Sequence, residues 1–330
     1  MNESQWIKTY ILPRSGATSG SFLGPGDDAS VGPSLATDSP VLTVDAMVEG
    51  QHFIGDWIDD ETLARRLLRS SISDLSAMGA TAVGFLLSVE TPCLPGRLGD
   101  RFWSSIDEQC EQLGITLLGG NVTASDGPLS LHCTFLGRVQ SGHEWRRSGA
   151  KSGDLLVVTG DPGMAAQARE RIAATAAVAR PPAADDRWSS PIPRIEVARA
   201  LASAAVDGPI VTAAIDLSDG LHLDLERLCQ ASGQRATIDI DALVETALAP
   251  TPDQVLAGGE DYELLMAIDP DSLDRFARIA AQHATRWHPI GVIESAASPA
   301  ATSDTVQVRL GGTVLKREPR GWDPFDLQQH

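Results

Sequence analysis

Acidic side chains that could bind a metal recur along the whole chain, and most of them stand where a strand is expected to end or a turn to begin. Carboxylates so far apart in sequence can converge in one site only if something offsets their repulsion. Hard divalent cations such as Mg²⁺ do this, and they also bind phosphate oxygens. The pattern therefore predicts a polycarboxylate metal site that handles a nucleotide. The segments are Gly26-Asp27-Asp28, Thr43-Val-Asp45, Ser73-Asp74-Leu, Asp216-Leu-Ser-Asp219-Gly and Gly259-Glu260-Asp261.

The segment from Asp216 to Gly220 is the most specific of these. Asp216 and Asp219 straddle a turn that should open a helix at Leu221, with Ser218 between them. Their carboxylates can face a metal while the helix N-terminus faces an anion. A second interpretation is equally open, in which Asp216 or Ser218 only caps that helix.

Other chemistry-bearing residues give weaker signals. Gly119, Gly120 and Asn121 could cradle a phosphate with backbone N–H groups, although a plain tight turn is the commoner meaning of such a segment. His52 is a lone histidine, which is more often a packing residue than a ligand. The chain has no P-loop and no Gly-x-Gly-x-x-Gly after a strand, so those nucleotide-binding motifs are excluded. No Ser/His/Asp or Cys/His order is strong enough to propose a covalent nucleophile.

Composition limits the classes of protein and partner. At 330 residues, two domains are expected. The formal net charge of -18 argues against nucleic acid and anionic membranes as partners. The start of the chain shows no signal peptide, and no uncharged run approaches a membrane span, so we expect a cytoplasmic protein. The cysteines form no Cys-x-x-Cys pair, which excludes the usual zinc spacings; they are Cys93, Cys110, Cys133 and Cys229.

Apolar patterning predicts alternating strands and helices in the first half of the chain. The strand that begins at Pro40 should end at Asp45, and the strand from Ile115 to Leu118 should empty into a turn at Gly119. The expected elements are a short helix at Glu3–Leu12, strands at 40–44, 82–89, 115–118 and 129–139, and helices at 61–78 and 97–113.

The pattern restarts near residue 148, which predicts two α/β domains, 1–148 and 149–330, with the site in the cleft between them. Residues 180–193 are rich in Pro, Ala and Asp and indicate a connector. The expected elements of this half are strands at 155–159, 213–215, 236–240, 262–268 and 306–315, and helices at 164–179, 194–205 and 221–232.

Taken together, the motifs resemble the thiamine-monophosphate kinase family, and they occur in its order from about residue 24 to Trp322. That resemblance implies an α/β (α+β), two-domain architecture like that of aminoimidazole-ribotide synthetase, with a mixed sheet in the N-terminal domain. It also implies a homodimer formed through the N-terminal halves. The matching segments are Gly26-Asp-Asp-Ala, Thr43-Val-Asp-Ala-Met-Val-Glu-Gly-Gln-His-Phe, Ser73-Asp-Leu-Ser-Ala-Met-Gly-Ala, Arg147-Ser-Gly-Ala-Lys-Ser-Gly-Asp, Ile215-Asp-Leu-Ser-Asp-Gly-Leu, Gly258-Gly-Glu-Asp-Tyr-Glu-Leu and Gly321-Trp-Asp-Pro-Phe.

The resemblance implies direct, in-line transfer of the ATP γ-phosphoryl group to thiamine monophosphate, with Mg²⁺ as cofactor and no phosphoenzyme. Catalysis would involve Asp216, Asp219 and Arg147. Thiamine would contact His52, Glu260 and Trp322. The residues implied for Mg²⁺ are Asp27, Asp28, Asp45, Asp74, Asp216 and Asp219, and those implied for ATP are Gly119, Gly120, Asn121, Arg147 and Ser218.

Several residues depart from the pattern of the family. Asn121 stands where an Asp is usual, and Val44 where a Ser or Thr is usual; each change weakens a metal site. Trp188 stands where a His is common. These departures leave three possibilities: a slower kinase with fewer metals, a synthetase with another acceptor, or a non-catalytic nucleotide-binding protein. If the first holds, Asn121→Asp should raise Mg²⁺-dependent ATP turnover.

Overall fold

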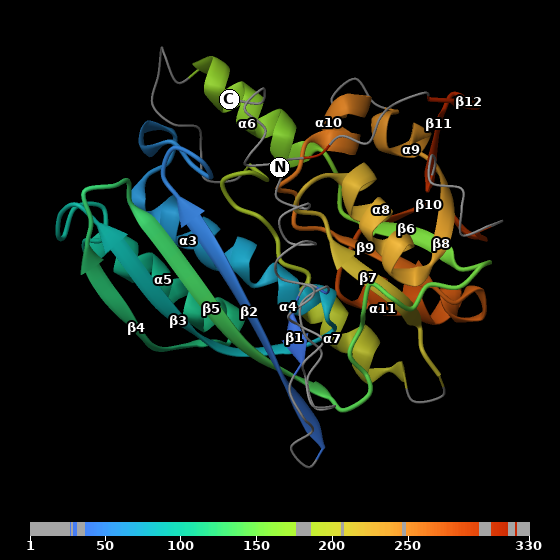
Figure 1. The fold of residues 1–330 in the computed structure, drawn as a ribbon, viewed down its shortest axis with the longest axis horizontal. Coiled ribbons are helices and arrows are strands. Elements are labelled where there is room, and N and C mark those ends of the chain that lie inside the picture. The colour runs from blue at the N-terminus through green and yellow to red at the C-terminus, as the bar shows by residue number, and fades with distance from the viewer. Residues whose placement is uncertain are drawn as a thin grey trace.

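The computed structural model describes residues 27, 29–31, 37–175, 186–205, 208–245, 249–296, 305–315 and 321 of the chain. Two β-sheets, one from each half of the sequence, stand side by side and carry helices on their faces (Figure 1). This confirms the two-part α/β architecture that the sequence predicts. The expected helix at Glu3–Leu12 and the candidate site residues Asp28 and Trp322 lie outside the described residues.

The N-terminal sheet has the strand order β1-β2-β5-β3-β4. The β3–β4 pair is parallel and the other pairs are antiparallel, so the sheet is mixed, as expected. Strand β4 forms one edge. The strands are β1 (Ser30–Val31), β2 (Asp38–Val48), β3 (Thr81–Thr91), β4 (Thr116–Ala124) and β5 (Ser130–Gln140).

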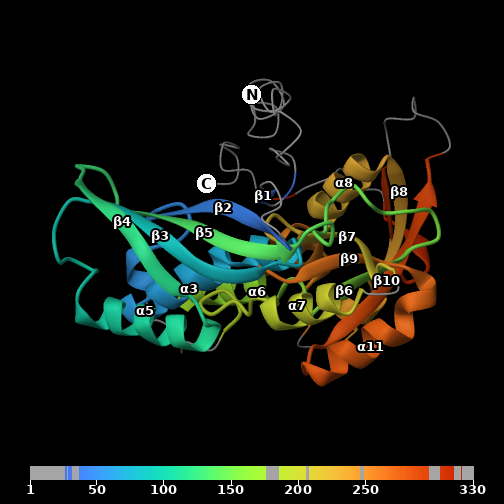
Figure 2. The same ribbon diagram turned by 90° about the horizontal axis from the view of Figure 1, so that it is seen from below.

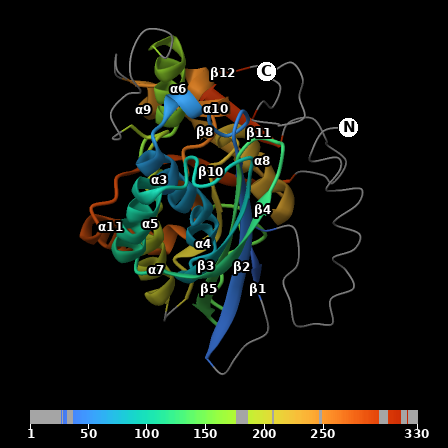
Figure 3. The same cartoon turned by 90° about the vertical axis from the view of Figure 1, so that its left-hand side faces the viewer.

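Helices α3 (Asp60–Ser71) and α5 (Asp100–Leu113) cover one face of this sheet (Figures 2 and 3). Burial alternates along β5, because successive side chains of a strand point to opposite faces and only one face meets the helices. Phe85 and Phe135 stack on the covered face with ring centroids 5.3 Å apart. The opposite face exposes apolar side chains, among them Leu42, Val44 and Leu86.

The C-terminal sheet has the strand order β12-β11-β8-β10-β6-β9-β7. Its strands are β6 (Leu155–Thr159), β7 (Val211–Asp216), β8 (Gln234–Asp239), β9 (Leu264–Ile268), β10 (Trp287–Ser295), β11 (Val306–Leu310) and β12 (Thr313–Val314). The helices of this half are α6 (Met164–Thr175), α7 (Ile195–Ser203), α8 (Leu221–Ser232), α9 (Asp241–Val244), α10 (Pro252–Ala257) and α11 (Leu273–Gln282).

Both faces of the C-terminal sheet are covered. Leu265 and Ala267 of β9 pack in one hydrophobic cluster with α8 and α10. Leu264 and Met266 pack in another with α7 and α11. Every residue of β9 is therefore buried, which explains its continuous apolar sequence.

Two helices join the halves. The short helix α4 (Ser73–Ala77) comes from the N-terminal half and packs against β7 and α7 of the other half. Helix α6 belongs to the C-terminal half, yet its Ala165, Ala168 and Ile172 are part of the N-terminal core. These two contacts bring the ends of β2 and β7 toward the same space.

Several element boundaries differ from those expected. The helix expected at 61–78 is broken at Ile72 into α3 and α4. The Ser70 and Ser71 hydroxyls bond to carbonyls four residues earlier, a pattern that bends helices. The strand expected to end at Asp45 continues to Val48. Gly119 to Asn121 do not form a turn, because they lie inside β4.

Two elements have the bounds predicted from the sequence, and two others have no counterpart in that prediction. The strand at Leu155–Thr159 and the helix at Leu221–Ser232 are confirmed at both ends. Helix α11 and strand β10 were not predicted. Strand β10 carries Pro289 and Gly291, both rare inside strands, and its pairing with β6 shifts register between them. None of the helices in the described part of the chain is long and apolar enough to cross a bilayer.

Candidate active site

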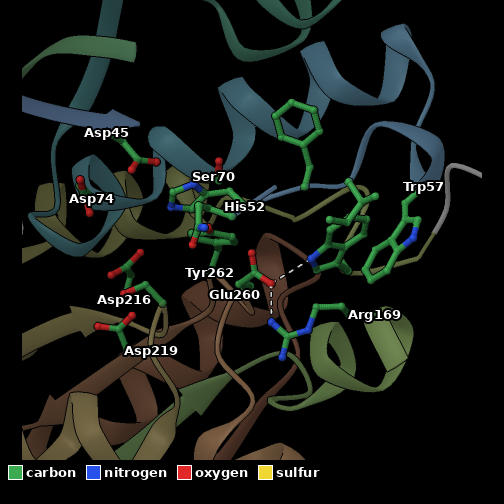
Figure 4. Close-up of a pocket in the computed structure, with 15 residues that line it drawn as sticks. Asp45, His52, Trp57, Ser70, Asp74, Arg169, Asp216, Asp219, Glu260 and Tyr262 are labelled. Carbon is green, nitrogen blue, oxygen red and sulfur yellow. Dashed lines mark hydrogen bonds and ion pairs between the residues drawn. The ribbon is translucent and has the colours of Figure 1, made fainter. Parts of the chain in front are cut away.

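A pocket of about 450 Å³ lies between the two halves of the molecule (Figure 4). Both halves contribute side chains to its wall, so it occupies the cleft in which the site was expected. The predicted site residues that line it are Asp45, His52, Asp74, Asp216, Ser218, Asp219 and Glu260. The other lining residues are Gln51, Phe53, Ile54, Trp57, Ser70, Arg169, Trp188 and Tyr262.

Four carboxylates from three different segments gather at one end of the pocket (Figure 4). Asp45 belongs to β2 and Asp74 to α4, whereas Asp216 ends β7 and Asp219 lies in the turn that follows. Asp216 is buried, with 3% of its surface exposed. Residues separated by up to 174 positions in sequence therefore meet at one acidic surface.

Neighbouring groups fix the orientation of Asp45 and Asp74. The backbone N–H of Ala46 donates to Asp45 Oδ1 at 2.8 Å, and the Ser71 hydroxyl donates to Asp45 Oδ2 at 3.2 Å. The Thr43 hydroxyl donates to Asp74 Oδ2. Burial raises the pKa of Asp45, so the ionised form is costly there unless positive charge is near.

The turn from Asp216 to Gly220 is held by a residue inside helix α8. Asp224 is fully buried, and its Oδ2 accepts the N–H groups of Asp219 at 3.0 Å and Gly220 at 3.1 Å. The N-cap position of α8 is Gly220, and no side chain caps it from that position. The interpretation of Asp216 or Ser218 as a mere helix cap is therefore wrong.

Asp219 has a cation close to its carboxylate. Arg227 Nη1 contacts Asp219 Oδ2 and also Asp224 Oδ1, the latter at 2.9 Å. Burial raises the pKa of Asp224 to about 7, against the opposing charges of Arg227 and Arg147. Arg227 and Asp224 could not be selected from the sequence, although both follow Asp219 by one to two helical turns.

The acidic end suits a hard metal ion in its chemistry. Asp45, Asp74 and Asp216 offer only oxygen atoms, the donors that Mg²⁺ prefers, and no cysteine is among the lining residues. Within the described residues, no three His, Cys, Asp or Glu side chains are close enough to form a metal cage by themselves. The donor set therefore fits a metal that completes its shell with phosphate oxygens and water.

The other end of the pocket is built around Glu260. Its carboxylate accepts hydrogen bonds from Arg169 Nη1 at 2.8 Å and from Trp188 Nε1 at 2.9 Å (Figure 4). The same carboxylate also pairs with Arg66. Burial would raise the pKa of Glu260, but Arg66 and Arg169 outweigh it and lower that pKa. Glu260 is thus a fixed, ionised acceptor at physiological pH.

An unusual backbone conformation directs Glu260 into the pocket. Its φ is +62° and that of Tyr262 is +52°, values that side-chain-bearing residues rarely adopt. The N–H of Glu260 donates to Ser218 O at 2.7 Å, and that of Tyr262 donates to Leu217 O at 2.9 Å. These bonds hold the Glu260–Tyr262 segment against the turn that carries Asp219. The backbone of the Glu260 end is therefore hydrogen-bonded directly to the backbone of the acidic end.

The loop after β2 supplies His52 and two aromatic side chains. The N–H of Val48 donates to His52 Nδ1 at 3.0 Å, so a neutral His52 carries its proton on Nε2. Trp57 meets Trp188 edge to face, with ring centroids 6.0 Å apart. The guanidinium carbon of Arg66 lies over the Trp188 ring, 4.4 Å from the ring centroid. The wall opposite the acids is therefore aromatic.

Some predicted site residues do not line the pocket. Gly119, Gly120 and Asn121 lie on exposed edge strand β4, where Asn121 donates to the Thr123 hydroxyl at 3.2 Å. Arg147 is outside the wall, although its charge acts on Asp224 and Arg227. Its N–H donates to Asp27 Oδ1 at 2.6 Å.

Asp261 points away from the pocket that Glu260 faces. Its carboxylate accepts the N–H groups of Gly163 at 2.7 Å and Ala165 at 3.1 Å, at the start of α6. Burial raises its pKa to about 7. Asp261 therefore positions α6, the helix that brings Arg169 to Glu260.

Three conspicuous lining residues are not among those predicted from the sequence: Trp57, Arg169 and Tyr262. Tyr262 could have been found, because it stands next to the acidic pair in Gly-Gly-Glu-Asp-Tyr. Arg169 lies in an Ala-rich helix and Trp57 in a loop, and nothing in their local sequence distinguishes them from surface residues. Their role follows only from the contact between the halves.

Comparison with known proteins agrees with this geometry. Residues 26–139 match the family model "AIR synthase related protein, N-terminal domain", and residues 151–303 match the corresponding C-terminal domain. The fold and the cleft thus define an AIR synthase related protein.

Curated relatives narrow the family. The thiamine-monophosphate kinase of Caulobacter vibrioides is 35% identical over 284 residues, which cover 80% of this chain and 76% of the relative. That of Escherichia coli K12 is 36% identical over 256 residues, covering 74% and 76%. The chain belongs to the thiamine-monophosphate kinase family, and it is a phosphotransferase.

Solved structures share the fold over nearly the whole chain. Thiamine-monophosphate kinase from Stenotrophomonas maltophilia K279a has a TM-score of 0.70 and 27% identity, and the match covers 94% of this chain and 96% of that one. AaThiL complexed with AMPPCP and TMP has a TM-score of 0.77 and 23% identity, with coverage of 98% and 97%.

Proposed function

We propose that this protein is a Mg²⁺-dependent kinase that transfers the γ-phosphoryl group of ATP to thiamine monophosphate, giving thiamine diphosphate and ADP. The observation that carries the proposal is that one pocket has two chemically different ends. Acids suited to metal-bound phosphates lie at one end, and a fixed carboxylate among aromatic rings lies at the other. Relatives named thiamine-monophosphate kinase and the AaThiL complex with AMPPCP, an ATP analogue, support the same assignment.

In this proposal the acidic end holds the metal and the polyphosphate. Asp45, Asp74 and Asp216 bind Mg²⁺, joined by Asp28 and, more weakly, by Asp219. When bound, the metal neutralises the negative charge of the phosphates. Ser218 faces the nucleotide from the pocket wall, and Arg147, which lies outside that wall, is assigned to the nucleotide by the resemblance alone. Asp219 keeps its pairing with Arg227 and serves mainly to fix the turn.

The acceptor end binds thiamine. The aminopyrimidine and thiazolium rings are flat and cationic or hydrogen-bond donating, so they suit a carboxylate beside indole rings. Glu260 accepts a hydrogen bond from the substrate, His52 offers its Nε2–H, and Trp57 and Trp188 pack on the rings. Trp322 is assigned to the same end.

The reaction requires little proton transfer. An anionic oxygen of the acceptor phosphate attacks the γ-phosphorus in line, an O–P bond forms, and the bond between the γ-phosphorus and the β–γ bridging oxygen breaks to release ADP. Because the nucleophile is already charged, no general base is needed. The protein contributes by aligning the two phosphates across the pocket.

One observation favours a second candidate, a related enzyme with another acceptor. Trp188 replaces the histidine expected at this position, and it narrows the Glu260 end with an indole ring. The intact Glu260 segment favours thiamine monophosphate instead. Parallel assays with thiamine and thiamine monophosphate distinguish the two, because a kinase of the proposed type phosphorylates only the monophosphate.

We also propose a homodimer in which the open faces of two N-terminal sheets meet. Among the described residues, that face exposes Leu42 at 41%, Val44 at 67%, Leu86 at 46% and Leu118 at 50%. An apolar sheet face of this kind is normally covered. We propose that a second copy of this chain covers the face, because the same apolar patch on two copies can pack against itself across a two-fold axis. Asn121 is paired with Ser88, two residues from Leu86, so it lies on this same face.

The remaining assignments follow from the proposed substrates. The domains are 1–148, which carries the dimer face, and 149–330, which completes the cleft. A biosynthetic kinase that uses ATP belongs in the cytoplasm. Small molecules are its partners, and the net charge of -18 disfavours nucleic acid.

The direct test is an assay of the purified protein with ATP, Mg²⁺ and thiamine monophosphate, in which thiamine diphosphate is separated and quantified. We expect stoichiometric ADP and thiamine diphosphate. EDTA should stop the reaction and added Mg²⁺ should restore it. Turnover that is unchanged in EDTA would refute the metal assignment, and ATP binding without product would support the non-catalytic alternative.

A further inference from the structure

The loop between β2 and α3, residues 49–58, is a large part of the acceptor end but has little structure of its own. It contributes His52, Phe53 and Trp57 to the pocket wall. Within the loop, short turns provide hydrogen bonds. The Gly50 N–H donates to Phe53 O at 2.7 Å, and Gly55–Trp57 form a 3₁₀ turn. A loop of this kind needs support from outside to hold its side chains in place.

Arg97, which lies outside the pocket wall, supplies such support. Its Nη1 donates to Gly55 O at 3.1 Å, and its Nη2 donates to Ile58 O at 2.6 Å. Its Nε donates to Asp60 Oδ1 at 2.8 Å, at the first turn of α3. Its guanidinium also lies 5.8 Å from the Phe53 ring centroid. One side chain therefore contacts the loop at three points and ties it to a helix.

Those contacts distinguish Arg97 from an ordinary surface ion pair. A pair with Asp60 alone would only link two segments and would contribute little. Two of the acceptors, however, are backbone carbonyls of the loop itself, and the planar guanidinium fixes their relative positions. Arg97 is 23% exposed and its partner Asp60 33%, so solvent only partly competes for these bonds.

We propose that Arg97 is a positioning residue for the acceptor: it holds loop 49–58 so that His52, Phe53 and Trp57 form a ready-made binding wall. This inference rests on the proposed function for the identity of the acceptor. It assigns control of acceptor affinity to a residue that touches neither substrate. The acids Asp45, Asp74 and Asp216 lie in β2, α4 and β7, outside this loop, so we expect a much smaller effect on ATP binding.

The test compares Arg97→Met, Arg97→Lys and Arg101→Met with the unaltered protein. Arg101 is a matched control, because it also joins the start of α5 to α3 but pairs only with the exposed acids Asp59 and Glu61. For Arg97→Met we expect the KM of thiamine monophosphate to rise roughly tenfold, as expected when hydrogen bonds to a charged donor are lost. The KM of ATP and kcat stay within about twofold. Arg97→Lys is intermediate and Arg101→Met is unchanged.

Hydrogen exchange provides a readout that does not depend on activity. Amides of residues 49–58 should exchange faster in Arg97→Met than in Arg101→Met, while those of β5 stay equally protected. Unchanged exchange and unchanged acceptor KM would overturn the inference. A lower kcat and melting temperature with unchanged KM would do so too, because they indicate a purely structural residue. If the unaltered protein forms no thiamine diphosphate, the proposed function fails, and the exchange of residues 49–58 still decides the role of Arg97.

Discussion

The indole Nε1 of Trp188 donates a hydrogen bond of 2.9 Å to the carboxylate of Glu260. The same carboxylate pairs with Arg66 and Arg169, so its charge is balanced before any substrate arrives. Glu260 is therefore oriented by the protein rather than by the ligand. Trp188 joins the two roles of this end, because it both fixes the carboxylate and forms the aromatic wall with Trp57.

Trp188→Phe should weaken acceptor binding selectively. The phenyl ring keeps part of the wall but cannot donate to Glu260, and a hydrogen bond to a charged acceptor contributes about 1.5–3 kcal/mol. We expect the KM of thiamine monophosphate to rise roughly tenfold, with the KM of ATP unchanged. Steady-state kinetics with each substrate varied in turn measures both constants.

Trp103→Phe is the matched control for that variant. Trp103 is 38% exposed on α5 and packs edge-on against Phe102, away from the pocket. It should behave like the unaltered protein. Equal acceptor KM values for Trp188→Phe and Trp103→Phe would contradict a binding role for Trp188.

Asp216→Asn and Asp219→Asn should differ in severity. Asp216 is buried at the acidic end, so loss of its charge should reduce kcat by roughly a hundredfold or more, as loss of a main electrostatic contact does. Asp219 is already paired with Arg227, so Asp219→Asn should cost less. Titration with Mn²⁺ should show weaker metal binding in Asp216→Asn than in Asp219→Asn. The exposed Asp239→Asn is the control, and a larger loss in Asp219→Asn would contradict this ranking.

The stability of the fold should depend on pH through Asp261. Burial raises its pKa from 3.8 to about 7 in the folded protein. Between about pH 4 and pH 7 the folded state therefore binds more protons at this site than the unfolded chain, and this contribution to stability is lost as pH rises. Asp261→Asn removes the titration, so its free energy of unfolding should fall less steeply with pH. Urea unfolding at several pH values measures the slope, and Asp274→Asn, at an exposed site on α11, should keep the slope of the unaltered protein.

A charge on the open face of the N-terminal sheet should disrupt the proposed dimer. Val44 is 67% exposed on strand β2 of that face, so Val44→Glu would bury two unpaired carboxylates across a two-fold interface. Sedimentation should show a dimer for the unaltered protein and a monomer for Val44→Glu. Val314→Glu, on exposed strand β12, should remain dimeric. A monomeric unaltered protein would exclude the proposed interface.

Most of the architecture could be predicted because it depends on local patterns. The apolar run of Leu155–Thr159 and the amphipathic, glycine-terminated Leu221–Ser232 define their elements at both ends. Strand β10 could not be predicted, since Pro289 and Gly291 interrupt it and its pairing partners β6 and β8 supply its stability. The prediction of a turn at Gly119 to Asn121 is wrong. Adjacent glycines usually indicate a turn, but these lie inside strand β4.

The candidate site divides in the same way. Acids in short motifs, such as Asp45, Asp74 and Asp216, could be selected from the sequence, and the structure brings them to one pocket. Arg169 and Trp57 could not, because their place depends on how helix α6 and a loop meet across the two halves. Asp261 was grouped with Glu260 by adjacency, yet the backbone turn at Glu260 sends the two side chains to different sites.

The most direct test of the carboxylate site is the rate of thiamine diphosphate formation by the unaltered protein and by Asp74→Asn, with ATP and saturating Mg²⁺. We expect product from the unaltered protein, equal in amount to ADP, and essentially none from Asp74→Asn. Equal rates of thiamine diphosphate formation in the two proteins would show that the gathered carboxylates do not carry the reaction.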